Sequence, residues 1–235
     1  MNTDQFTLAA STATLADEPA AREHADVVEF RLDLAAEPLD ALTAYDGELP
    51  ILATNRAAWE GGGATDDSRR LEELTAATDV DAVEAIDVEL AAIENASAES
   101  LCETARERGV AIVASAHDFE ATPPRAELVR TLSRARSYAD VAKLAVTATT
   151  RADTLALLSV TEQLTRQGQA VATMAMGEVG RHTRVVAPVY GSKIGYAPVD
   201  AASATAPGQF DLATLAALVE QVSPRPQSGP ADEHP

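Results

Sequence analysis

One lysine in this sequence stands where its chemistry would be unusual. The stretch Val141–Thr147 is an apolar run with the length and β-branched content of a buried strand, and Lys143 lies near its middle. Burial disfavours an ammonium and favours the neutral amine, which can attack a carbonyl carbon and form a Schiff base. The alternative is structural: the amine reaches solvent from the strand end or pairs with a buried carboxylate. One other lysine, Lys193, occurs in the chain.

A histidine ends the apolar run that precedes the lysine strand. His117 closely follows residues 110–115, whereas His24, His182 and His234 fall in an expected helix, a loop and the C-terminal tail. An imidazole near its intrinsic pKa can take up a proton and return it within one reaction. The sequence therefore places a candidate nucleophile and a candidate acid–base group on consecutive strands.

Charged side chains alternate with apolar ones in a strand near the N-terminus. In residues 27–33, Glu29, Arg31 and Asp33 share one side, because successive side chains of a strand point to opposite faces. In a half-buried strand that side would face solvent. In a closed barrel it is the lumen, where three charges need partners or a ligand.

The elements that must position these residues alternate along the chain. Eight short runs are mostly apolar, as in a parallel sheet buried on both faces. The expected strands are residues 6–12, 27–33, 50–55, 85–90, 110–115, 141–147, 170–176 and 185–190. The expected helices are residues 17–24, 39–45, 66–78, 97–108, 122–136, 151–166 and 211–222.

This alternation predicts an α/β fold, a (βα)8 TIM barrel that forms a single catalytic domain over residues 1–223. Residues 224–235 have the composition of a disordered tail. An open doubly wound sheet is the alternative, but no glycine-rich phosphate fingerprint follows the first strand. In a barrel the functional face lies where the strands end, and Arg56, His117 and the glycines at 61–63 fall there.

The composition narrows the class of protein. Asp and Glu outnumber Lys and Arg by 37 to 18, which gives a formal net charge of -19 distributed along 235 residues. Such a field repels nucleic acids and anionic membranes. It fits a salt-rich cytoplasm, where salt screens the self-repulsion, or an ordinary acidic soluble protein. Cys102 has no second cysteine to pair with, and no export signal or membrane-length apolar run is present, so we expect a cytoplasmic protein.

Short motifs in a fixed order give the chain a family resemblance. They are Glu29-Phe-Arg31, Arg56 with Glu60-Gly-Gly four residues later, Ser115-Ala-His117-Asp-Phe, Lys143, Met176-Gly-x-x-Gly-x-x-x-Arg184, Tyr190-Gly-Ser192 and Ala206-Pro-Gly-Gln209. In this combination the chain resembles the type I 3-dehydroquinate dehydratases from about Phe6 to Leu215. The resemblance implies a hydro-lyase of the shikimate pathway, on the route to aromatic amino acids. Its reaction converts 3-dehydroquinate to 3-dehydroshikimate by syn elimination of water.

The resemblance also implies roles for individual residues. Lys143 matches the Schiff-base lysine, His117 the general acid and base, and Glu60 the carboxylate that orients the histidine. Residues that match substrate-binding positions are Arg184 for the carboxylate, then Glu29, Arg31, Arg56, Gln209, Thr205 and Ser11. The family usually has serine where this chain has Thr183 and Thr205, and each threonine keeps the hydroxyl while adding a methyl group.

The implied chemistry requires no metal and no organic cofactor, and the sequence has no His and Asp cluster with metal-ligand spacing. The expected partner is the small-molecule substrate, without nucleic acid or membrane, and the resemblance suggests a homodimer. Residues 191–208, rich in Gly, Ala and Pro, are the candidate lid over the substrate.

Two other functions fit parts of the pattern. A Schiff-base aldolase of the same barrel fold also uses a strand lysine, but a sugar-phosphate substrate would need a phosphate-binding loop after strands seven and eight. A catalytically silent barrel could act as a binding protein, and its inner polar residues would then be dispensable. Retention of lysine, histidine and glutamate together favours the enzyme.

Overall fold

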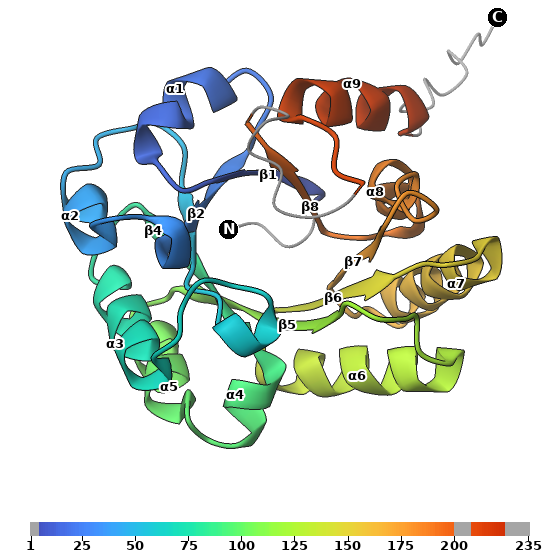
Figure 1. Cartoon of the computed structure of the whole chain (residues 1–235), viewed down its shortest axis with the longest axis horizontal. Helices are drawn as coiled ribbons and strands as arrows, with labels where there is room; N and C mark the ends of the chain where they lie inside the picture. The colour runs from blue at the N-terminus through green and yellow to red at the C-terminus, as the bar shows by residue number, and fades with distance from the viewer. Residues whose placement is uncertain (1–4, 200–207, 224–235) are drawn as a thin grey trace, which may run out of the picture.

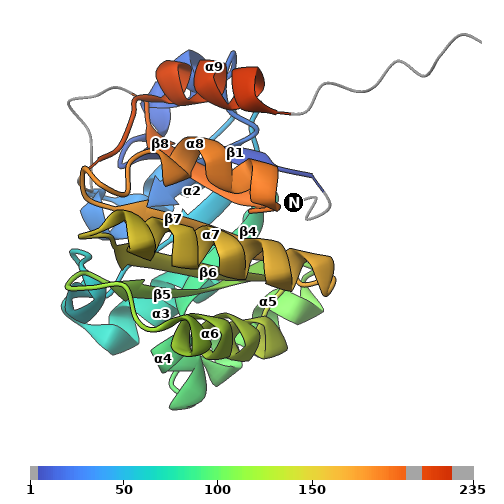
Figure 2. The ribbon, with the colours of Figure 1, turned by 90° about the vertical axis from the view of Figure 1, so that its right-hand side faces the viewer.

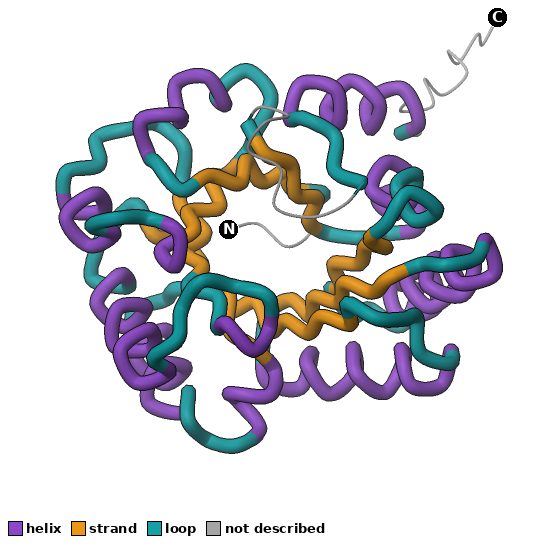
Figure 3. Tube along the Cα trace, in the orientation of Figure 1, coloured by secondary structure: helices purple, strands orange, loops and turns teal. Residues whose placement is uncertain are grey.

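The computed structural model describes residues 5–199 and 208–223, in which eight parallel strands form one sheet in the order β7-β6-β5-β4-β3-β2-β1-β8. The sheet curls into a nearly closed barrel with helices around it (Figures 1 and 3), which confirms the predicted (βα)8 barrel. The strands are β1 (Thr7–Thr12), β2 (Val27–Arg31), β3 (Ile51–Thr54), β4 (Val83–Glu89), β5 (Ala111–Asp118), β6 (Val141–Thr147), β7 (Val171–Met176) and β8 (Ile194–Pro198).

Helices cover the outside of the barrel, and α6 to α9 follow one another along one side of it (Figure 2). The α-helices are α1 (Glu18–Ala21), α2 (Pro38–Thr43), α3 (Asp67–Ala77), α4 (Leu90–Glu94), α5 (Glu99–Glu107), α6 (Arg125–Tyr138), α7 (Arg151–Arg166), α8 (Thr183–Val186) and α9 (Leu212–Val222). Four 3-10 turns are η1 (Leu15–Asp17), η2 (Leu32–Leu34), η3 (Ala58–Glu60) and η4 (Ala187–Tyr190). In the described part of the chain, no helix has both the length and the apolar character that a membrane span requires.

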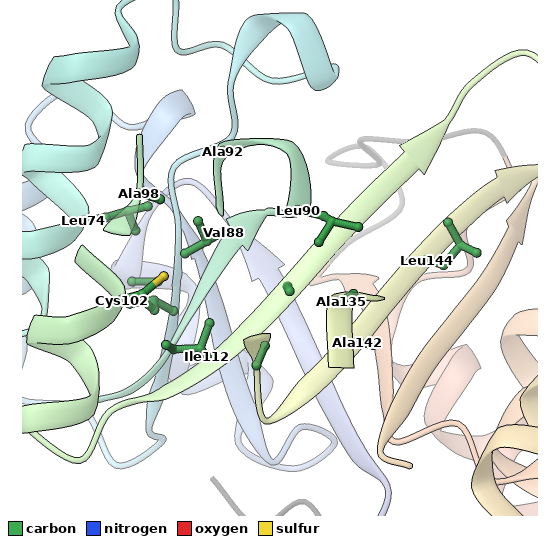
Figure 4. Close-up of a cluster of buried hydrophobic side chains, with 14 of the residues drawn as sticks. Leu74, Val88, Leu90, Ala92, Ala98, Cys102, Ile112, Ala135, Ala142 and Leu144 are labelled. Atoms are coloured by element: carbon green, nitrogen blue, oxygen red, sulfur yellow. The ribbon is translucent and has the colours of Figure 1, made fainter. Parts of the chain in front are cut away.

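The main hydrophobic core lies between the outer face of the sheet and the helices. Figure 4 shows the part of it in which Val88 of β4 and Ile112 of β5 belong to one buried cluster with Leu74 of α3 and Cys102 of α5. Packing of this kind fixes α3 and α5 against the strands that they connect.

The inward side chains of the strands change from apolar to polar toward the carboxyl ends. In β4 and β6, Ala85 and Val141 belong to the apolar cluster inside the barrel. Asp87 and Lys143 follow two residues later on the same faces, because the side-chain period of a strand is two. Apolar packing therefore closes one end of the lumen, and polar groups gather at the end where active sites of such barrels lie.

The barrel has a seam between β7 and β8, which no strand ladder joins in residues 5–199. There Thr173 N donates to Ser192 Oγ at 3.0 Å, and Ala175 N donates to Thr183 Oγ1 at 2.9 Å. These hydroxyls satisfy edge N–H groups that a neighbouring strand would otherwise bind. Thr183 thus uses its hydroxyl to close the seam.

The predicted eighth strand at residues 185–190 is wrong. These residues form the end of α8 and the turn η4, and the eighth strand is Ile194–Pro198. A short apolar run cannot be assigned from periodicity alone, and Pro188 lacks the N–H group that a strand ladder needs. Gly191 ends the turn in the left-handed conformation with φ of 96°.

Other boundaries also differ from expectation. Strand β8 occupies part of the predicted lid at residues 191–208, and residues 200–207 of that lid lie outside the described residues, as does the predicted tail at 224–235. Helix α4 has no counterpart among the predicted helices, because the predicted fourth strand ran into its first residue, Leu90.

Candidate active site

A pocket opens at the carboxyl ends of the strands, in the mouth of the barrel. It collects all the predicted site residues that the structure describes, which are Ser11, Glu29, Arg31, Arg56, Glu60, His117, Lys143, Arg184 and Gln209. The remaining predicted residue, Thr205, lies outside the described residues. Groups from β1 to the segment after β8 thus meet in one place, as parallel strands of a barrel require.

Lys143 is buried in this pocket, with 5% of its surface exposed. Its Nζ lies 2.9 Å from Asp87 Oδ2 and 3.9 Å from Glu29 Oε1. The amine also lies 4.2 Å from the centre of the Tyr196 ring. A buried carboxylate therefore does pair with this amine, as the structural alternative predicted, but the pairing occurs in a residue that lines the pocket.

Asp87 accepts hydrogen bonds from three donors. Its Oδ1 accepts from Arg56 Nη2 and Ser115 Oγ, both at 2.6 Å, and its Oδ2 accepts from Lys143 Nζ. Burial by itself would raise the pKa of Asp87, but the charges of Arg56 and Lys143 outweigh burial and lower that pKa below its usual range. The aspartate therefore stays ionised beside the amine.

His117 and Glu60 form a second buried pair. His117 Nδ1 lies 2.7 Å from Glu60 Oε1, so Nε2 is the ring nitrogen that can face a ligand. Burial raises the pKa of Glu60 to about 7. Burial, together with the charges of Arg56 and Lys143, lowers the pKa of His117 well below its ordinary value. Near neutral pH the pair combines a neutral imidazole with a carboxyl group at its titration point, so it can take up and release a proton.

Two glycines let the loop after β3 carry Glu60 close to the histidine. The Phe119 ring stacks on the His117 imidazole, with centres 5.8 Å apart and planes 9° apart. A Cβ on Gly61, whose φ is 80°, would lie 2.5 Å from that phenyl ring, and one on Gly62 would lie 2.1 Å from the carbonyl oxygen of Arg56. Any larger residue would push the loop away from the histidine.

Arg184 has no carboxylate within ion-pair distance among residues 5–199 and 208–223, and its buried Nε has no hydrogen-bond partner there. Burial lowers the pKa of Arg184 to about 10. A buried guanidinium without a counter-ion is unfavourable until an anion binds, and its fork of donors matches a carboxylate bidentately. The arrangement therefore fits recognition of an anionic group of a ligand.

Other predicted residues lie around these groups. Glu29 accepts hydrogen bonds from Ser11 Oγ and, at 3.2 Å, from Thr54 Oγ1. Strand β2 ends at Arg31, so Asp33 lies in η2 and not in the lumen as predicted. There it accepts from Arg31 Nε at 2.8 Å and Nη2 at 2.6 Å.

Sequence reasoning assigns no role to Asp87, Glu89 or Tyr196. A signal for the two acids exists, because they alternate with apolar residues in β4 as Glu29 and Arg31 do in β2. Tyr196 lies in the misplaced eighth strand. Within the described ranges, no group of three or more His, Cys, Asp or Glu side chains could hold a metal ion.

Comparison with known proteins places this site in a family context. The family model described as type I 3-dehydroquinase matches residues 7–224. A 3-dehydroquinate dehydratase of Haloarcula marismortui is 55% identical over 225 residues, which cover 94% of this chain and 98% of that protein. One of Halobacterium salinarum is 50% identical and covers 93% of this chain and 98% of its own length. Both organisms are halophilic archaea.

A solved structure agrees with these relatives. The crystal structure of 3-dehydroquinate dehydratase from Geobacillus kaustophilus superposes with a TM-score of 0.81 at 27% sequence identity. The alignment covers 92% of this chain and 91% of that one.

The raised pKa of Glu60 makes a prediction for stability. The folded protein holds this proton up to about pH 7, whereas an ordinary glutamate loses it near 4.5. Folding stability therefore falls as the pH rises through that window, and Glu60→Gln removes the loss. We expect the unfolding free energy of the variant, minus that of wild type, to increase by about 3 kcal/mol from about pH 4.5 to pH 8. Denaturant unfolding at each pH measures this difference. Glu162→Gln is the control, because that side chain is 44% exposed and is paired with Arg166. If the difference between Glu60→Gln and wild type does not change with pH, the raised pKa of Glu60 is not its cause.

Proposed function

The chain belongs to the type I 3-dehydroquinase family, and we propose that it eliminates water from 3-dehydroquinate to give 3-dehydroshikimate through an imine on Lys143. The observation that carries this proposal is the presence of three distinct groups in one pocket: a buried amine, the His117–Glu60 pair and the Arg184 guanidinium. The substrate has a ketone, an acidic C–H bond and a carboxylate, which these groups match one for one.

Imine formation begins when the Lys143 ammonium passes one proton to the His117–Glu60 pair and the resulting amine attacks the C3 carbonyl carbon of the substrate. The pair returns that proton to the oxygen of the carbinolamine, which leaves as water, and the nitrogen becomes a positively charged, protonated imine. Asp87 and Glu29 lie 2.9 Å and 3.9 Å from this nitrogen in the free protein. Both carboxylates therefore stabilise the charged intermediate.

Elimination uses the imine as an electron sink. The positive nitrogen acidifies the adjacent C2–H bond, and Nε2 of His117 takes that proton, which leaves an enamine. The enamine expels the C1 hydroxyl group, and the imidazolium returns the proton so that the group leaves as water. One histidine acts on one face of the ring, which makes the elimination syn, and hydrolysis of the imine then frees the product and the lysine.

Glu60 serves the histidine in both transfers. Its contact at Nδ1 fixes the ring so that Nε2 points to the substrate. With a pKa of about 7, the carboxyl group is matched to a histidine that gains and loses a proton in each cycle near neutral pH.

Substrate recognition is assigned to the remaining pocket residues. Arg184 binds the carboxylate, and Ser11, Glu29, Arg31 and Gln209 contact the ring hydroxyls or the carboxylate. Arg56 is bound to Asp87 and Ser115, so we assign to it the holding of Asp87 in addition to substrate contact. Thr205 keeps its proposed contact, although it lies outside the described residues.

Three further proposals concern context. The reaction belongs to the shikimate pathway, and the net charge of -19 suits a salt-rich cytoplasm and disfavours binding of nucleic acid. The family resemblance suggests a homodimer. Sedimentation velocity in concentrated potassium chloride tests this, and a monomer mass at micromolar concentration would reject the dimer.

The test of function is turnover of 3-dehydroquinate, followed by the ultraviolet absorbance of the conjugated enone product in concentrated potassium chloride. We expect Lys143→Ala to lose at least about a thousandfold in kcat, because no imine can form. His117→Ala should also slow elimination strongly while still forming the imine. Lys193→Ala, which removes the other lysine, is the control, and a fully active Lys143→Ala protein would reject the mechanism.

The guanidinium of Arg184, which has no carboxylate partner within residues 5–199 and 208–223, makes a separate prediction. Arg184→Ala should raise KM for 3-dehydroquinate by about ten- to a hundredfold, because a charge-assisted contact with the substrate carboxylate is lost. Steady-state kinetics measure the effect, and Arg181→Ala, on the neighbouring turn with its side chain 42% exposed, is the control. An unchanged KM for Arg184→Ala would contradict the assigned contact.

A further inference from the structure

An arginine outside the barrel is among the largest fully buried side chains of the described residues. Arg70, on α3, is 1% exposed and is not part of the pocket lining. Its Nη1 lies 2.7 Å from Glu89 Oε2, and its Nε donates to Asp67 Oδ1 at 2.6 Å. The guanidinium also lies 5.8 Å from the centre of the Trp59 ring. Burial of a charge is costly, and these contacts are the ones that compensate it.

Glu89 connects this arginine to the mouth of the barrel. The carboxylate ends β4, and its second oxygen, Oε1, lies 3.1 Å from Arg56 Nη1. The same oxygen accepts a hydrogen bond from the backbone N–H of Ala57 at 2.9 Å. One carboxylate therefore fixes both a pocket arginine and the backbone that follows it.

The first connection leads to the lysine. Arg56 Nη2 donates to Asp87 at 2.6 Å, and Asp87 accepts from Lys143 Nζ at 2.9 Å. The charges along this path alternate in sign from Arg70 to Glu89 and on to the lysine. Removing the outermost cation would leave Glu89 with Arg56 as its one cationic partner on this path and would weaken the orientation of each next member.

The second connection leads to the histidine. Ala57 precedes the turn η3, whose last residue is Glu60, the partner of His117. The middle residue of that turn, Trp59, donates from its indole to Asp67 at 3.1 Å, and the same carboxylate holds Arg70. Through Glu89 and Asp67, Arg70 is thus connected to the residue before the turn and to its middle residue.

We propose that Arg70 is a positioning residue, which through Glu89 sets the geometry of both the Asp87–Lys143 pair and the Glu60–His117 pair. It touches neither pair itself, so it belongs to the shell that supports a site and not to the groups that contact substrate. The kinetic test of this inference rests on the proposed function, because it uses turnover of 3-dehydroquinate. The contacts of Arg70 do not depend on that function.

The test compares two neighbouring arginines of α3. Arg70→Met keeps the length of the side chain and removes its charge. Arg69→Met is the control, because that side chain is 74% exposed and is paired with Glu73. We expect Arg70→Met to lower kcat by about ten- to a hundredfold, as small displacements of catalytic groups do, while KM changes by less than about threefold. Arg69→Met should match wild type in both.

A pH profile separates positioning from a mere loss of folded protein. The charged groups that face Glu60 are Arg56 from its own loop, Asp87 and Glu89 from β4, His117 from β5 and Lys143 from β6. Without Arg70 the negative charge of Glu89 is less compensated, and it raises the pKa of Glu60 further. The acid limb of kcat/KM should therefore move to higher pH in Arg70→Met, and in Arg70→Lys it should lie closer to its wild-type pH.

Several outcomes would overturn the inference. Kinetics of Arg70→Met equal to those of Arg69→Met would do so, as would a lower kcat that matches the lost folded fraction without any shift in pH profile. If Arg70→Met does not fold, Asp67→Asn replaces it, since that carboxylate is 56% exposed and holds Arg70 in place. Arg70 then keeps its charge, so the criterion is a fall in kcat at unchanged KM, and an unchanged kcat would overturn the inference.

A second readout keeps this inference distinct from the proposed function. If the wild-type protein does not convert 3-dehydroquinate, the proposed function fails. The inference is then decided by a titration of His117 that is monitored by NMR. The His117 signal is assigned by its loss in His117→Ala. We expect its titration to move to higher pH in Arg70→Met and to stay at the wild-type position in Arg69→Met, and coincident titrations would reject the role of Arg70.

Discussion

Charges buried in an apolar barrel must be paired, and the site depends on how that pairing is made. Asp87 is its centre, because it accepts from Lys143, Arg56 and Ser115 at once. This holds a lysine where a neutral side chain would normally pack, and it keeps a carboxylate 2.9 Å from any positive charge on the lysine nitrogen. The cost of burial is thus offset by the same contacts to which the proposed mechanism assigns stabilisation of the charged imine.

Among the described residues, the cations of the pocket differ in whether a carboxylate pairs with them. Lys143 and Arg56 are held by carboxylates, whereas Arg184 enters beside the β7–β8 seam without one among the described residues. The hydroxyls of Ser192 and Thr183 close that seam in place of a strand ladder. Helix α8 can therefore lie there and carry the guanidinium of Arg184 to the pocket. An incoming carboxylate would complete the pairing, as the proposed contact with the substrate requires.

Much of this arrangement could be predicted from the sequence, and the exceptions have physical causes. Apolar runs located seven of the strands, and they placed Lys143 near the middle of a buried one. The eighth run failed because apolar content does not separate a strand from a helical turn, and Pro188 was the neglected signal. The role of Asp87 follows from pairing across strands that lie 56 residues apart in sequence, which periodicity within one strand cannot reveal.

The central claim is that Lys143, held by Asp87, is the residue that bonds to the substrate. Borohydride reduction of the protein with 3-dehydroquinate in concentrated potassium chloride, followed by peptide mass mapping, tests it most directly, because reduction makes an imine permanent. The account predicts a substrate-sized mass increment on the peptide that contains Lys143. An increment on the Lys193 peptide, or none on folded protein that turns over the substrate, would contradict it.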